Sequence, residues 1–168
     1  LDRGRRRSDA TDEQHEQMVK QRRIGTLITI IEMPLGTKLS AVEHAALHDA
    51  LDSCIGATND RPTLRGVYEH LGLLAGGKSG RDSRVAEGAV QPRYVLRRFV
   101  DGDLSGLFED ESTVAFDQDA PIVVTDTSEL FARGELAAQL TQVCSTAWIQ
   151  AVISDRAAHR TRYVVREE

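Results

Sequence analysis

Apolar residues recur at three- and four-residue spacing through the first hundred positions, a pattern typical of helices with one buried face. It predicts a helix over about 11–33, a second over 40–56, and a third that ends in a Gly/Ser/Lys loop over 75–83. A weaker helical stretch covers 84–100, and Pro92 is its expected break. We therefore expect a bundle of helices over this part of the chain.

Capping residues set the expected helix ends. Pro34 and Gly36 should end the first helix. Short polar side chains can accept hydrogen bonds from the free N–H groups of a first turn. The candidate N-terminal caps are Thr11 with Gln14, Ser40 with Glu43, and Asp60 or Thr63.

The pattern changes after residue 112. A short β-like run covers 113–116, and a continuous apolar run over 121–125 suits a strand buried in a parallel sheet. A long helix is expected over about 134–156, followed by a strand over 162–165. Strand, helix and strand in this order form a βαβ unit.

The predicted fold class is α/β with mostly α-helix. A helical subdomain over 1–110 precedes a partial α/β core over 111–168. The expected strands need neighbours, and exposed strand edges invite pairing, so we also predict self-association.

Composition is that of an ordinary globular chain. Its 168 residues are 40% hydrophobic and 28% charged, enough for one core and without a run of the ~18 apolar residues that a membrane span needs. Cys54 and Cys144 have no metal or redox spacing, and we interpret them as small buried hydrophobes in a reducing compartment. The expected location is the cytoplasm, with a peripheral position at the inner face of the membrane as the alternative.

Charge is unevenly distributed along the chain. The net charge is -5, yet residues 3–7 hold four arginines and residues 101–135 hold ten Asp or Glu against a single Arg. An acidic stretch of this kind repels a nucleic-acid backbone. We predict no direct nucleic-acid binding and interpret both charged runs as solvated surface.

One segment, from Gly72 to Ser79, matches the phosphate-loop motif G-x-x-x-x-G-K-[ST]. The motif binds phosphates when a strand delivers the loop and a helix follows it. Here helical spacing precedes Gly72, so the glycines are better explained as a helix end and a loop. Gly77, Lys78 and Ser79 are nucleotide-binding candidates only if the chain is a compact NTPase.

Two acidic positions follow the expected strands. Glu167 stands where P-loop ATPases carry the residue that activates the attacking water, but Arg166 occupies the neighbouring magnesium position and cannot bind that ion. Asp126 could contact a nucleotide at the edge of a sheet or cap the helix that follows it, and capping is the interpretation we favour.

His44 and His48 lie one helical turn apart. Such a pair can bind a metal when further ligands are nearby. No third ligand is evident in the sequence, so no metal site is predicted.

Several segments occur in an order that resembles a known family. They are Leu1-Asp2, 39–43 (Leu-Ser-Ala-Val-Glu), 61–64 (Arg-Pro-Thr-Leu), 106–108 (Gly-Leu-Phe), 123–130 (Val-Val-Thr-Asp-Thr-Ser-Glu-Leu), the helix with Trp148, and 163–168 (Tyr-Val-Val-Arg-Glu-Glu). The set looks like the C-terminal ATPase domain of the conjugation and type IV secretion ATPases, in an actinobacterial-looking version.

The resemblance implies an arrangement. Residues 11–100 would be a helical insert, 112–168 would return to the RecA-like P-loop NTPase core, and Glu167 would match the catalytic Glu. The family's phosphate loop would lie upstream, so the chain would be an internal fragment of a cytoplasmic ATPase that powers conjugative DNA transfer or type IV secretion. ATP and Mg²⁺ would bind the longer parent but not this fragment, and other secretion-channel components would be its partners.

Two alternatives stay open. The chain could be a helical protein-interaction module with no enzymatic role. It could also be a compact NTPase that uses Gly72–Ser79 as its phosphate loop.

Overall fold

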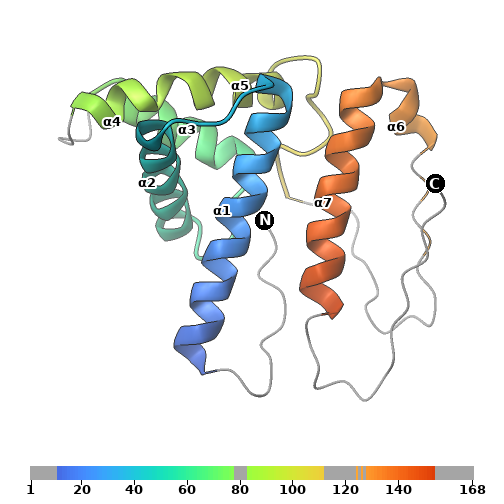
Figure 1. Ribbon diagram of the computed structural model, residues 1–168, viewed down its shortest axis with the longest axis horizontal. Coiled ribbons are helices and arrows are strands. Elements are labelled where there is room, and N and C mark those ends of the chain that lie inside the picture. The colour runs from blue at the N-terminus through green and yellow to red at the C-terminus, as the bar shows by residue number, and fades with distance from the viewer. Residues whose placement is uncertain (1–10, 78–82, 112–123, 125, 127, 154–168) are drawn as a thin grey trace.

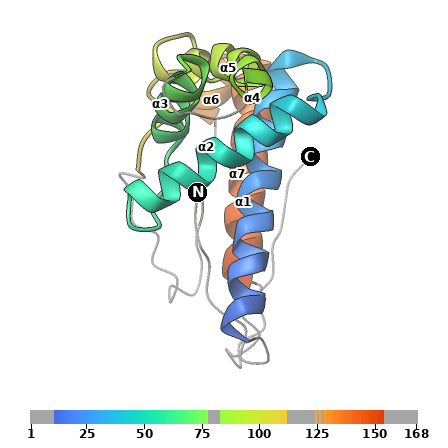
Figure 2. The ribbon, with the colours of Figure 1, turned by 90° about the vertical axis from the view of Figure 1, so that its left-hand side faces the viewer.

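The computed structural model describes residues 11–77, 83–111, 124, 126 and 128–153, and these form an all-helical arrangement (Figure 1). The helices are α1 (Asp12–Leu35), α2 (Ala41–Ala57), α3 (Leu64–Ala75), α4 (Ser83–Gly88), α5 (Val90–Val100), α6 (Ser128–Ala132) and α7 (Glu135–Ile153). Helices α2 to α5 gather around one end of α1, and α7 runs beside α1 in both views (Figures 1 and 2).

Local capping explains where the helices begin. The Thr11 hydroxyl accepts the Gln14 N–H while the Gln14 side chain accepts the Thr11 N–H, and Ser40 makes the same reciprocal pair with Glu43. Both predicted capping boxes are thus confirmed. Helix α1 ends where Gly36 adopts a left-handed conformation, with φ of 72°.

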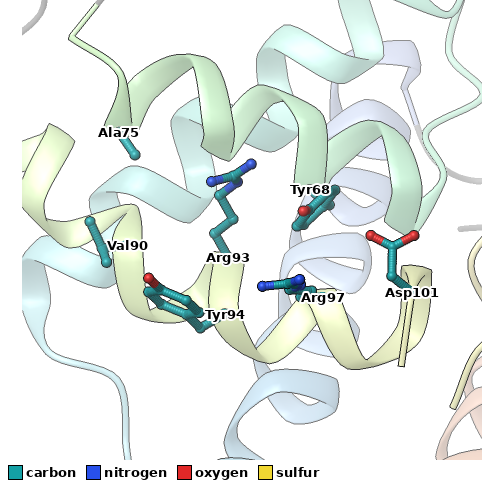
Figure 3. A pocket seen from close by; sticks show the side chains of 7 residues that line it. All are labelled: Tyr68, Ala75, Val90, Arg93, Tyr94, Arg97 and Asp101. Atoms are coloured by element: carbon teal, nitrogen blue, oxygen red, sulfur yellow. The ribbon is translucent and has the colours of Figure 1, made fainter. Parts of the chain in front are cut away.

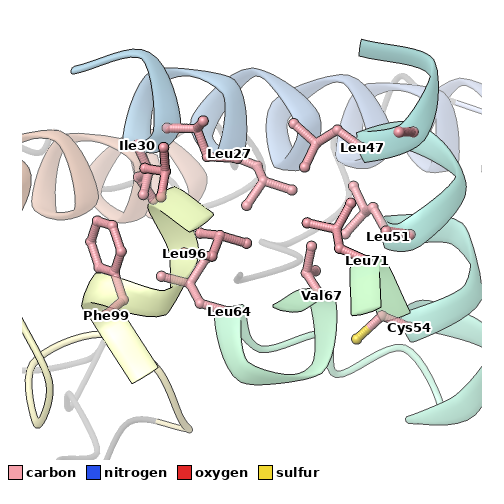
Figure 4. Close-up of a cluster of buried hydrophobic side chains, with 14 of the residues drawn as sticks. Leu27, Ile30, Leu47, Leu51, Cys54, Leu64, Val67, Leu71, Leu96 and Phe99 are labelled. Carbon is pink, nitrogen blue, oxygen red and sulfur yellow. The ribbon is translucent and has the colours of Figure 1, made fainter. Parts of the chain in front are cut away.

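The hydrophobic core lies where α2, α3 and α5 meet the second half of α1 (Figure 4). Its fully buried side chains include Leu27 and Ile30 of α1, Leu47 and Leu51 of α2, Val67 and Leu71 of α3, and Leu96 and Phe99 of α5. Helix α7 contributes Ala137 and Leu140 to the same core. Burial of these apolar side chains is the main stabilising term, at about 25 cal/mol per Å² removed from water.

A partly buried ion pair joins α1 to the turn between α2 and α3. The Arg23 guanidinium, whose side chain is only 4% exposed, pairs with the Asp60 carboxylate and also donates to the Asp60 carbonyl at 3.0 Å. Asn59 and Asp60 both have positive φ, 48° and 70°, which is uncommon outside glycine. The cap of α3 is Thr63, one of the two predicted candidates, and its hydroxyl accepts the Gly66 N–H.

The predicted α/β fold class is wrong. None of the residues that the structure describes forms a strand, so there is no βαβ unit and no RecA-like core among them. Val124, from the expected strand 121–125, is 85% exposed, whereas a central parallel strand is buried on both faces. The rest of that run and the expected strands over 113–116 and 162–165 lie outside the described residues.

The helices predicted over 134–156 and 84–100 agree better with the structure than the predicted strands do. The helix expected over 134–156 is present as α7, but it packs against α1 and α6 and not against a sheet. The stretch 84–100 does break in two, at Ala89 and not at Pro92. Pro92 lies in the first turn of α5, where its missing N–H has no helical partner to lose.

None of the helices in the described ranges combines the length and the apolar character that crossing a membrane requires.

Candidate protein-interaction groove

Helix α5 presents two different faces. Its inner face is buried in the core, and its outer face carries a stripe of exposed residues spaced three or four apart. The outer stripe consists of Val90, Arg93, Tyr94, Arg97 and Asp101.

This outer stripe lines one wall of a groove of about 450 Å³, and Tyr68 and Ala75 of α3 line the other wall (Figure 3). The groove is open to solvent, and its walls combine apolar, aromatic and charged side chains. Tyr94 is 67% exposed and Val90 is 42% exposed. Concave sites with apolar walls and a few charged groups are the usual places where proteins bind ligands and peptide segments.

The Arg93 side chain crosses from α5 to α3. Its guanidinium carbon lies 4.9 Å from the centre of the Tyr68 ring, within the range of a cation–π interaction. A Cβ atom at Gly72 would approach the Arg93 Nε to 3.0 Å. The glycine therefore leaves the space in which the guanidinium lies over the ring.

Arg93 and Arg97 differ electrostatically from the other arginines nearby. Arg65 forms two hydrogen bonds to Asp110, Arg98 forms two to Asp103, and these contacts raise the pKa of both guanidinium groups. Neither Arg93 nor Arg97 forms an ion pair with any carboxylate in the part of the chain that the structure describes. The two groove arginines thus retain free donors for a ligand.

The residues of the phosphate-loop match do not form a site in the described part of the chain. Gly72 lies in the last turn of α3, so a helix stands where a phosphate loop requires a strand. Gly77 follows in a turn with φ of 66°. Lys78 and Ser79 lie outside the described residues, as do Arg166 and Glu167.

Asp126 has a local structural role. Its carboxylate accepts both the N–H and the hydroxyl of Ser128 at the start of α6. These bonds lower its pKa, with the hydroxyl of Ser128 making the larger contribution. The geometry is that of a capping turn, which is the interpretation favoured for this residue.

The cysteines and histidines contribute little to a site. Both cysteines are free thiols: Cys54 is buried in the core, and burial raises the pKa of Cys144 to about 11. Such thiols are poor nucleophiles at neutral pH because the thiolate is the reactive form. His44 and His48 lie on α2, and the described residues hold no group of three potential metal ligands.

Comparison of the chain with known proteins found no match among protein-family models, curated proteins or solved structures. The resemblance to secretion ATPases stays a prediction, and the RecA-like core that it implies is wrong for the described residues, which form no strand. Fold and groove together define a helical domain with a preformed cationic and aromatic groove.

The groove residues were not identified as a site from the sequence. A signal was nevertheless present, since Arg93, Tyr94 and Arg97 recur at helical spacing on the side of α5 opposite its apolar residues. The contribution of α3 had no such signal, because Tyr68 and Gly72 belong to another helix and approach Arg93 only through packing.

Proposed function

We propose that this chain is a helical protein-interaction domain without enzymatic activity, and that it binds a segment of a partner protein in the groove between α3 and α5. The observation that carries the proposal is the combination of an exposed Tyr94, an exposed Val90 and two arginines without acidic partners in one groove. Tyr and Arg are the residue types most enriched in protein interfaces and in their energetic hot spots.

The rest of the domain supports this interpretation. Arg93 lies over Tyr68, so less side-chain freedom would be lost on binding than with a mobile arginine. The groove walls belong to two helices that pack against each other and against α2, which makes the site largely preformed.

A selection from a displayed random-peptide library tests the proposal. We expect enriched peptides that bind the chain and lose most of their affinity for the variant Tyr94→Ala. Leu73→Ala is the matched control, because Leu73 is also a large exposed apolar residue, at 53%, but does not line the groove.

Selected peptides that bind the Tyr94→Ala variant as well as the unchanged chain would place the interaction elsewhere and refute the proposal. A selection that enriches no peptide would refute it too. Circular dichroism of both variants checks that the helices are intact, so that loss of binding reflects the groove.

A further inference from the structure

The groove has a fixed order of chemical groups along its length. Figure 3 shows Val90 and the Tyr94 ring toward one end of the groove, Arg93 and Arg97 in the middle, and Asp101 at the other end, so the lining passes from apolar and aromatic to cationic and then to acidic. The eleven residue steps of helix from Val90 to Asp101 span about 16 Å at 1.5 Å per residue. The two ends of the groove therefore attract different groups.

Each part of this order selects one kind of ligand group. Val90 together with Ala75 offers an apolar wall to an aliphatic side chain. The Arg93 guanidinium lies over the Tyr68 ring and forms no ion pair with a described carboxylate, so its N–H groups can donate to a carboxylate of the ligand. Asp101 repels a further carboxylate and favours a cationic side chain.

From this order we infer that the groove binds an amphipathic helix of an acidic partner, whose contact face carries an aliphatic residue, two carboxylates and a basic residue in sequence. This inference rests on the proposed function and names its ligand. A ligand helix lying along α5 repeats the same spacing, so the four residues fall at i, i+4, i+7 and i+11.

An acidic peptide fits better than a nucleic acid on charge. The groove includes Asp101 as well as its two arginines. A single-stranded nucleic acid would bring a phosphate to every position, including the one at Asp101, although its bases could stack on the tyrosines. A peptide can place its charges only where the arginines are.

Fluorescence anisotropy with designed peptides tests the inference. The probe is an alanine-based helical peptide of about 16 residues with Leu, Glu, Glu and Lys at i, i+4, i+7 and i+11. The matched control has the same composition with the order Leu, Lys, Glu and Glu, which puts a carboxylate opposite Asp101. We expect the first peptide to bind about tenfold more tightly, roughly the effect of one charge-assisted hydrogen bond.

Two variants of the domain separate the arrangement of the groove from its net charge. Arg97→Gln removes one cation and should weaken the ordered peptide about tenfold. Gly72→Ala keeps every charge but brings a Cβ to 3.0 Å from the Arg93 Nε, so the guanidinium must shift over the Tyr68 ring and binding of this peptide should also weaken. Gly76→Ala is the control, since a Cβ there meets only backbone oxygens and not Arg93.

The outcomes are distinct. Equal binding of the two peptides, or stronger binding of a labelled oligonucleotide of about twelve nucleotides, would overturn the inference. Failure of both peptides while the library selection yields binders dependent on Tyr94 would overturn the charge order and leave the proposed function standing. Failure of the selection as well would remove both.

Discussion

Gly88 should be one of the least replaceable residues of the fold, and its change to alanine measures how closely α4 packs on α2. A Cβ atom at Gly88 would lie 2.6 Å from the Val42 carbonyl oxygen, 2.8 Å from its carbon and 2.9 Å from its Cγ1. Two of these atoms belong to the backbone of α2, so no rotamer change removes the clash. Gly25 is the matched comparison, because it lies in α1 with nothing within 4 Å of its Cβ position.

The expected magnitude follows from these contacts. To restore an ordinary 3.4 Å separation from the carbonyl oxygen, the helices must move apart by roughly 0.8 Å. Overpacking of this kind costs about 1–3 kcal/mol. Gly25→Ala should instead stabilise the domain by about 0.5–1 kcal/mol, since alanine loses less backbone entropy in a helix than glycine.

Thermal and urea unfolding followed by circular dichroism at the helical band measures both changes. Each kcal/mol should move the Tm by about 2–4 °C in a domain of this size, in opposite directions for the two variants. Adding Val42→Ala should not rescue Gly88→Ala, because it removes only Cγ1 from the clash. Equal stability of Gly88→Ala and the unchanged chain, or full rescue by Val42→Ala, would refute the close backbone approach.

Two further predictions concern buried charges. Asp60→Ala should destabilise the domain by about 1.5–3 kcal/mol because it removes the carboxylate that pairs with the Arg23 guanidinium, whereas Arg23→Met removes the buried charge itself and should cost less. Comparison of the urea midpoints of the two variants checks this order, and a reversed order would contradict it. Burial acts to raise the pKa of Glu109, but N–H groups of Glu109, Gly106 and Phe108 donate to it and hold the pKa below the ordinary 4.5. Because the unfolded chain then binds the proton more readily, this carboxylate stabilises the fold above pH 4.5, and that contribution is lost as the pH falls through the lower folded pKa. The variant Glu109→Gln should therefore flatten the acid limb of a stability–pH curve, and an unchanged limb would count against the contact.

Local patterns explain why the helices were predictable. Capping boxes depend on residues three apart, and a buried helix face depends on residues three or four apart, so both can be recognised along the chain. The same reasoning failed at Val124, the described residue of the strand expected over 121–125. A short apolar run is equally compatible with a strand or with irregular structure until its neighbours are known, and Val124 has none covering it.

The sequence by itself determined the start of α1 at Thr11, the start of α2 at Ser40 and the stripe on α5, because each depends on residues within a few turns of one another. Tertiary structure decided the rest. Asp60 pairs with Arg23, 37 residues earlier, while Thr63 caps α3. The groove exists because packing brings Arg93 of α5 over Tyr68 of α3. The spacing of residues within one helix cannot predict a contact between two helices.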